Sequence, residues 1–147
     1  MSAVAAVTAA VVGAVALPAA AADHHPGRDR HPVVYISAVQ ADSPGRDDRS
    51  NRSLNREWVE VTNGSRWSVN LDGWTLSDED GHTYTFSHYR LDGRTTVRVH
   101  TGNGRDSRTD LFQDRRNYVW NNDYDTATLR NDHGRFVDDA SWGYHRR

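Results

Sequence analysis

From Val33 onward, short apolar stretches alternate with polar turns. Within the stretches, apolar and polar residues follow each other with the period of two that is typical of half-buried strands. In 57-EWVEVTN-63, Val59 and Val61 fall on one face of the expected strand, and Trp58 and Glu60 on the other. Beyond residue 22, no segment of a dozen residues has the 3.6-residue period of a helix. The pattern therefore predicts an all-β domain.

The alternation predicts about nine short strands. They cover residues 33–39, 57–63, 69–78, 82–86, 95–101, 109–112, 118–120, 126–131 and 135–142. Glycines that tolerate positive φ separate most of them, and Gly73 inside 69–78 indicates a bulge or a sharp bend. Short strands at regular spacing favour an immunoglobulin-like antiparallel β-sandwich. We expect its large core side chains to be Trp58, Trp74 and Trp120.

Residues 1–22 differ from the rest, because they carry no charge and are dominated by Ala and Val. They end in 17-LPAAAAD-23, where small residues precede the first charge, as at a signal-peptide cleavage site. We expect a signal-peptide helix that is cleaved after Ala22, and hence a secreted, extracellular protein. A membrane anchor is the weaker alternative for such an Ala-rich segment. No Arg or Lys follows Met1, so a start further upstream or a weakly inserting helix stays open.

The remaining chain divides into three expected parts. Residues 23–32 contain two prolines and no apolar period, which indicates a flexible linker. Residues 33–142 form the folded domain, and residues 143–147 a C-terminal tail. With no cysteine in the 147 residues, the domain has neither disulfides nor thiolate chemistry.

The charge pattern disfavours a nucleic-acid binder. All 18 basic residues are Arg, yet the net charge is -2. Two arginine clusters occur, and each is interrupted by aspartates, which favours a mixed, solvated surface over a phosphate track. The clusters are Arg46, Arg49, Arg52 and Arg56, with Asp42, Asp47 and Asp48, and then Arg115 and Arg116, with Asp114.

Catalytic motifs are not evident in the sequence. There is no G-x-S-x-G nucleophile motif. His82, His88 and His100 lie near expected strands or turns. Glycoside hydrolysis needs two carboxyl groups across a cleft, whereas the aspartate pairs occur where Asp commonly bonds its own backbone. These pairs are Asp47/Asp48, Asp78/Asp80 and Asp138/Asp139. We predict that the chain is not an enzyme, and we assign no catalytic or cofactor-binding residue.

A calcium site is the main alternative to a chain without functional ligands, because the chain is rich in Asp and expected to be extracellular. Three segments qualify: 42-DSPGRDD-48, 78-DEDG-81 and 121-NNDYD-125. If Asn121 opens an EF-hand loop, Thr126 stands where Gly is required, Asp132 where Glu is required, and 126-TATL-129 is strand-like.

We therefore assign no metal ligand. A calcium loop of another kind stays an alternative, above all at 42–48. His24, His25 and His31 could capture copper or zinc, but a solvated tail is favoured. We interpret 119-VWNNDYDTATLRNDHG-134 instead as a turn over 121–125, a strand over 126–131 and a hairpin loop over 132–134.

Several pieces, in order, resemble the lamin-tail domain family. They are 57-EWVEVTN-63, 71-LDGWTLSD-78, 83-TYTF-86, 91-LDGRTTVRVHTGNG-104, 109-TDLF-112 and 120-WNNDYDTATLRNDHGRFVD-138. The resemblance implies an immunoglobulin-like, non-catalytic module. Such modules bind partner proteins and, by report, DNA in lamins, and they accompany nucleases and other hydrolases in bacteria. The all-Arg usage and the Ala-rich leader resemble a protein from a GC-rich bacterium such as an actinomycete.

Two places depart from the family pattern. Tyr124 stands where bacterial members often have Gly, so it would be strained if its φ is positive. The connection 40-QADSPGRDDRSNRSLN-55 has no counterpart in lamins, and long loops on rigid scaffolds often carry function. We expect a secreted binding module at or outside the cell envelope, with a protein or a cell-wall polymer as partner. The alternatives are a calcium-stabilised adhesion module and a small secreted hydrolase or nuclease accessory.

Overall fold

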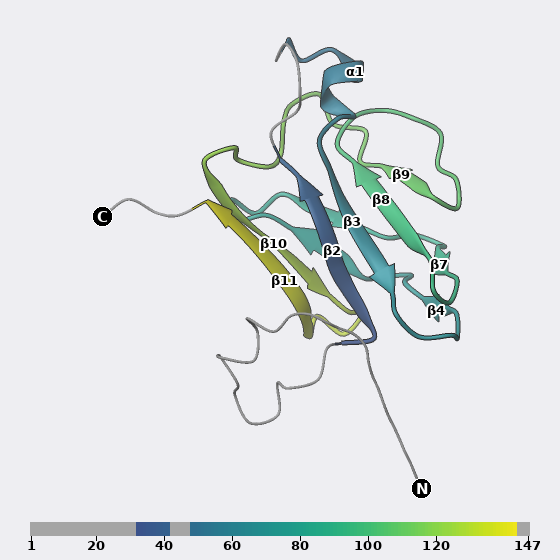
Figure 1. The fold of residues 1–147 in the computed structure, drawn as a ribbon. Coiled ribbons are helices and arrows are strands. Elements are labelled where there is room, and N and C mark those ends of the chain that lie inside the picture. The colour runs from purple at the N-terminus through teal and green to yellow at the C-terminus, as the bar shows by residue number, and fades with distance from the viewer. Residues whose placement is uncertain (1–31, 42–47, 144–147) are drawn as a thin grey trace, which may run out of the picture. The chain divides into compact units, whose positions relative to one another are not determined.

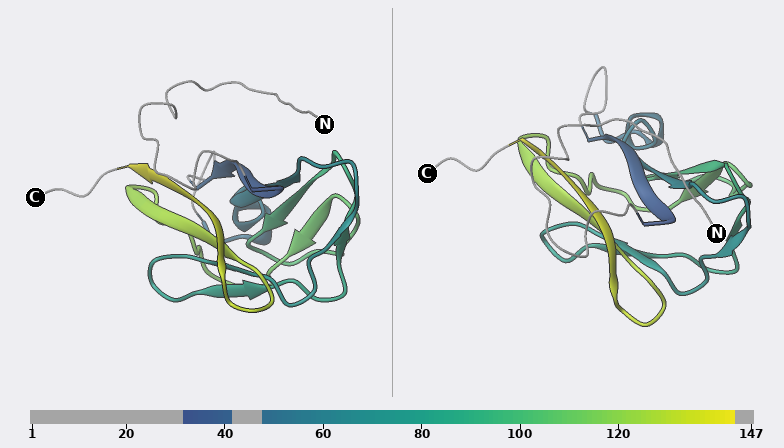
Figure 2. Two further views of the ribbon diagram at one scale, coloured as in Figure 1. Left: turned by 90° about the horizontal axis from the view of Figure 1, so that it is seen from below. Right: turned by 60° about the horizontal axis from the view of Figure 1, so that its bottom comes forward.

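Two β-sheets pack against each other in the computed structural model, which describes residues 32–41 and 48–143 (Figures 1 and 2). The expected leader, linker residues 23–31 and tail residues 144–147 lie outside this range. No helix within the described part is long and apolar enough to cross a membrane.

Each sheet has four strands. The first has the order β2-β3-β8-β9, with β2 (Val34–Gln40), β3 (Trp58–Asn63), β8 (Thr96–His100) and β9 (Asp110–Phe112). The second has the order β11-β10-β5-β6, with β11 (Phe136–Gly143), β10 (Tyr124–Arg130), β5 (Thr75–Ser77) and β6 (Thr83–Thr85). A smaller pair joins β4 (Val69–Asn70) to β7 (Arg90–Leu91), and one short helix, α1 (Asn51–Leu54), precedes β3.

The core lies between the sheets, as the alternation predicts. Val59 pairs with Val99 and Val61 with Val97 across β3 and β8, and all four side chains are fully buried. The opposite sheet contributes the paired Leu76 and Leu129, and these residues together with Phe86 belong to one hydrophobic cluster. The β-sandwich expectation is confirmed, with the difference that β8 and β9 pair in parallel.

Two of the predicted strands are wrong. Residues 69–78 are not one strand: the bend predicted at Gly73 is confirmed, with a φ of 84°, and it separates β4 and β5 into different sheets. Residues 118–120 form no strand, because the Val119 amide donates to the Glu57 carboxylate at 2.9 Å instead of to a neighbouring strand.

The three tryptophans predicted to fill the core differ in how far they are buried. Trp120 is buried at 2% exposure, and Trp74 is half-buried against the core. Trp58 lies on the outer face of β3, where the Arg98 guanidinium stacks 3.8 Å from its ring centroid. The prediction for Trp58 is wrong because Trp58 alternates with the buried Val59 and cannot share its face.

The edge strands β2 and β11 lie side by side without a continuous ladder (Figure 1). The Ile36 amide of β2 donates instead to the Asp138 carboxylate of β11 at 2.9 Å. The pairing of β2 with β3 shifts register between Ile36 and Ala38 at this point. Where the two sheets meet, the Asp138 carboxylate therefore accepts the hydrogen bond that the Ile36 amide could otherwise donate to a neighbouring strand.

Candidate functional site

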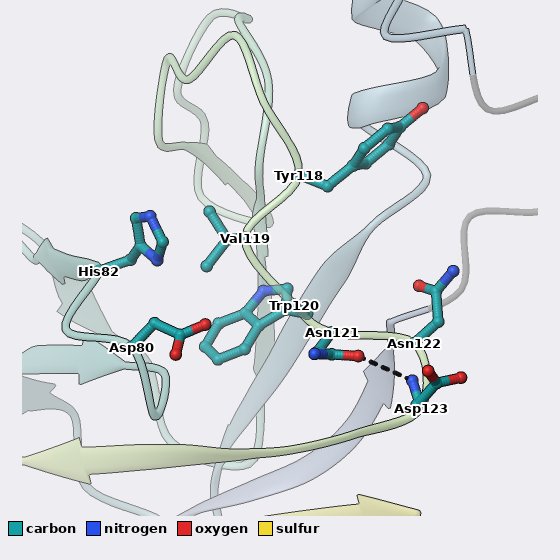
Figure 3. Close-up of a pocket in the computed structure, with 8 residues that line it drawn as sticks. All are labelled: Asp80, His82, Tyr118, Val119, Trp120, Asn121, Asn122 and Asp123. Atoms are coloured by element: carbon teal, nitrogen blue, oxygen red, sulfur yellow. Dashed lines mark hydrogen bonds between the residues drawn. The ribbon is translucent and has the colours of Figure 1, made fainter.

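A hollow of about 430 Å³ opens beside the segment that leads into β10. Asp80, His82 and residues 118–123 line it, as Figure 3 shows. His82 pairs with Asp78 at 2.6 Å, and the lining contains neither serine nor threonine. The hydroxyl of the lining belongs to Tyr118 and lies 2.7 Å from the Ser53 hydroxyl.

Two buried aspartates fix the walls of this hollow. Asp78 Oδ1 accepts from the amides of Asp80 and His82 at 3.0 and 2.7 Å. Asp125 accepts from the amides of Glu79, Asn121 and Thr126 at 2.8 to 3.0 Å, which ties the 78–82 turn to the 121–125 turn. Their oxygens face N–H groups, which repel a cation, so the calcium alternatives at 78–81 and 121–125 lose their two most buried ligands.

Of the remaining metal candidates, only Asp48 lies within the described residues. No group of three or more His, Asp or Glu side chains in the described part of the chain is placed to hold a metal ion. His24, His25, His31 and residues 42–47 lie outside the described residues. Asp48 is exposed and accepts from the Ser50 amide at 2.9 Å, just before α1.

Glu57 is a buried carboxyl group behind the hollow. Its Oε1 accepts from the Thr101 hydroxyl at 2.6 Å and from the Val119 amide at 2.9 Å. Burial raises the pKa of Glu57 to about 7, and the charge of Asp125 acts in the same direction, while these hydrogen bonds oppose it. Glu57 Oε2 and Trp120 Nε1 are buried without a hydrogen-bond partner among the described residues. The sequence reasoning missed this group.

The other histidines serve the fold. Both ring nitrogens of His100 lie 2.7 Å from acceptors, the Asn55 carbonyl and the Asp110 carboxylate. Although burial opposes it, hydrogen bonds from Thr109 and His100 lower the pKa of Asp110. His88 is exposed, with a φ of 52°. The three histidines do not converge on one site.

Of the three aspartate pairs considered in the sequence, Asp78/Asp80 and Asp138/Asp139 lie within the described residues. Asp138 reaches the β2 edge, whereas its neighbour Asp139 is exposed. Asp80 lines the hollow, but Asp78 is committed to the turn backbone. No two-carboxylate cleft forms from these pairs within residues 48–143.

The 40–55 connection is anchored where the structure describes it. Ser50 caps α1 by accepting from the Ser53 amide at 3.1 Å. The side chains of Asn51 and Asn55 donate to the Asn103 carbonyl at 2.9 and 2.8 Å. This part holds the 102–104 turn.

The arginine clusters are described in part. Arg46 is outside the described residues, while Arg49, Arg52 and Arg56 are exposed. Arg115 donates hydrogen bonds to the Gln113 side chain and the Thr83 carbonyl, and Arg116 is exposed.

Tyr124 is the first residue of β10 and is not among the residues with positive φ, so the backbone strain considered for it is absent.

A second surface, missed in the sequence reasoning, lies at the other end of β3. We define the tip as residues 64–68, the turn after β3, and residues 90–95, which are β7 and the turn that follows it; the backbones of the two turns touch. The Arg94 amide donates to the Ser65 carbonyl at 2.8 Å, and a Cβ on Gly93 would approach the Arg66 backbone to 2.4 Å. Trp67 is 71% exposed there, in a polar turn without periodic neighbours.

Asn63 holds the tip from beneath. Its buried Nδ2 donates to the carbonyls of Trp67, Leu91 and Asp92 at 2.7 to 3.3 Å. Its Oδ1 accepts from the amide and the hydroxyl of Ser65 at 3.0 and 2.8 Å. One asparagine side chain thus fixes both turns, and the exposed Trp67 is presented on a rigid support.

A family model described as Lamin Tail Domain matches residues 29–144. No curated protein matches the chain. The match covers the whole described sandwich, and domains of this family are immunoglobulin-like and generally act as interaction modules. The chain is therefore a member of the lamin tail domain family.

Proposed function

We propose that the chain is a secreted, non-catalytic binding module whose contact surface is the tip. The observation that carries this proposal is the exposure of Trp67, 71%, on turns that Asn63 holds in place. A tryptophan presents one of the largest apolar surfaces of any side chain, and leaving it in water forgoes burial energy. Rigid, exposed Trp and Arg side chains are the residues that dominate binding energy at interfaces.

The partner belongs to the cell envelope, as a protein or a wall polymer. Export supports this location, and the charge-free segment 1–22 supports export. We expect the secreted product to begin at Asp23. N-terminal sequencing of the protein recovered from the culture medium checks this, and a product that retains residues 1–22 would argue for an anchor.

Substitution of Trp67 tests the contact surface. Trp67→Ala is expected to weaken binding of the purified chain to wall material from the producing cells by roughly tenfold or more, because a central aromatic contact is lost. Co-sedimentation over a range of protein concentrations measures the affinity. The melting temperature should stay nearly constant, because an exposed side chain contributes little to folding.

Phe136→Ala is the matched control, since Phe136 is 50% exposed and lies on β11 in the other sheet. Its binding should equal that of the parent chain. An equal loss of binding affinity in both variants would indicate nonspecific adsorption through exposed aromatic side chains. Unchanged binding of Trp67→Ala would remove the tip from the proposal.

A further inference from the structure

The tip has a charge opposite to that of the chain as a whole. The chain has a net charge of -2, whereas residues 64–68 and 90–95 contain three arginines and one aspartate. The aspartate, Asp92, lies 3.8 Å from the guanidinium of Arg108, so a further cation faces the only anion of these turns. The surface around Trp67 is therefore positive on an otherwise acidic protein.

The three arginines are available to a ligand. Within residues 32–41 and 48–143, none of Arg66, Arg90 and Arg94 has an ion-pair partner. Arg90 reaches only the Ser68 hydroxyl, at 3.4 Å, and the Arg66 guanidinium lies 5.6 Å from the Trp67 ring centroid. Guanidinium groups bind carboxylates through two parallel hydrogen bonds, so these side chains suit carboxylate ligands.

Arg94 is held in a conformation that favours glycine. Its φ is 61°, in the left-handed region, where a side chain other than Gly, Asn or Asp is disfavoured. Among the described residues, no hydrogen bond or ion pair of the Arg94 side chain compensates for this strain, and strained residues gather at binding sites. Because glycine would satisfy the backbone better, the arginine side chain itself has a use at this position.

We infer that the tip binds an acidic glycan, a chain of sugars in which carboxylate groups recur at intervals. Trp67 offers a flat apolar face for a sugar ring, the arginines receive the carboxylates, and the Ser65 and Ser68 hydroxyls lie beside them. A polymer with a denser charge, such as single-stranded DNA, suits this surface less, because its flanking phosphates would meet the acidic remainder of the chain. The inference rests on the tip being the contact surface proposed above.

Binding of defined oligosaccharides to the full chain tests the inference. The probes are a hyaluronan hexasaccharide, with a carboxylate on every second sugar, the neutral chitohexaose, and a ten-nucleotide single strand of thymidines. Calorimetric titration should give at least roughly tenfold tighter binding of the hyaluronan fragment than of either other probe. The affinity should fall as salt rises, because the contacts are exposed ion pairs. Equal binding of chitohexaose, or tighter binding of the DNA strand, would overturn the inference.

Arg94→Gly separates binding from folding. This variant should melt several degrees higher than the parent chain, because it relieves the left-handed strain. It should bind the hyaluronan fragment roughly fivefold more weakly and with a smaller salt dependence. Arg116→Gln, which alters an exposed arginine outside the tip, should change neither property. A gain in melting temperature with undiminished binding would show that Arg94 does not serve the ligand.

The outcomes also distinguish this inference from the proposed function. If the oligosaccharide fails to bind while Trp67→Ala still abolishes wall binding, the acidic-glycan inference is wrong and the binding module stands. If neither oligosaccharide binding nor wall binding depends on Trp67, both the inference and the proposed contact surface are wrong.

Discussion

Asn63→Ala is expected to lower the free energy of unfolding by about 3 kcal/mol, because five hydrogen bonds converge on one buried side chain. Removing the amide leaves the Leu91 carbonyl without its buried partner and releases the 64–68 turn from the 91–92 backbone. Urea denaturation measures the loss, with an unchanged slope showing that the unfolding reaction itself is the same.

Asn70→Ala is the matched control for this variant. Asn70 ends β4 just before a turn, but it is exposed, and its side chain accepts a single hydrogen bond, from the Asp72 amide at 3.0 Å. Its loss should stay near the typical net value of one hydrogen bond, about 1 kcal/mol. If Asn63→Ala cost no more than Asn70→Ala, Asn63 would not be the support of the tip.

Glu57→Gln is expected to change how stability depends on pH. The pKa of Glu57 is raised to about 7 in the folded domain, above its ordinary 4.5, so the folded state holds the proton more tightly than the unfolded chain. The stability that this proton provides is complete below pH 4.5 and is lost as the pH rises through 7. The shift corresponds to roughly 3 kcal/mol.

Glutamine keeps the acceptor oxygen for Thr101 and Val119 but cannot ionise. The variant should therefore gain stability relative to the parent chain between pH 5 and pH 8, by up to roughly 3 kcal/mol at the upper end. Urea denaturation at several pH values gives the difference. A constant difference between Glu57→Gln and the parent chain over this range would contradict the buried ionisation of Glu57.

The period-two alternation predicted most of the sandwich because burial follows it closely. Val59, Val61, Val97 and Val99 are inside as expected. The same alternation, extended one step in each direction from Val59 and Val61, also places Glu57 and Asn63 inside. This signal was present in 57-EWVEVTN-63, but both residues are polar, and only their specific partners make their burial tolerable.

Other features depend on contacts between distant segments. The parallel pairing of β9 with β8 rests on three residue pairs. The sequence of so short a strand does not predict which strand it pairs with. Trp67 has no periodic neighbours, so its exposure on a rigid turn follows only from the bonds that Asn63 makes to residues 67, 91 and 92. Residues 42–47 of the 40–55 connection lie outside the described residues, so a site there stays a prediction.

The carboxylate that Asp138 directs at the edge of β2 has a consequence for crowded surfaces. If the chain binds the wall as proposed, many copies would gather on one support, where free strand edges would let neighbouring molecules join into continuous sheets. A second molecule that tried to pair with β2 here would have to displace a charge already bonded to the Ile36 amide. Many copies on one support would then stay a layer of separate domains and would not join into fibrils.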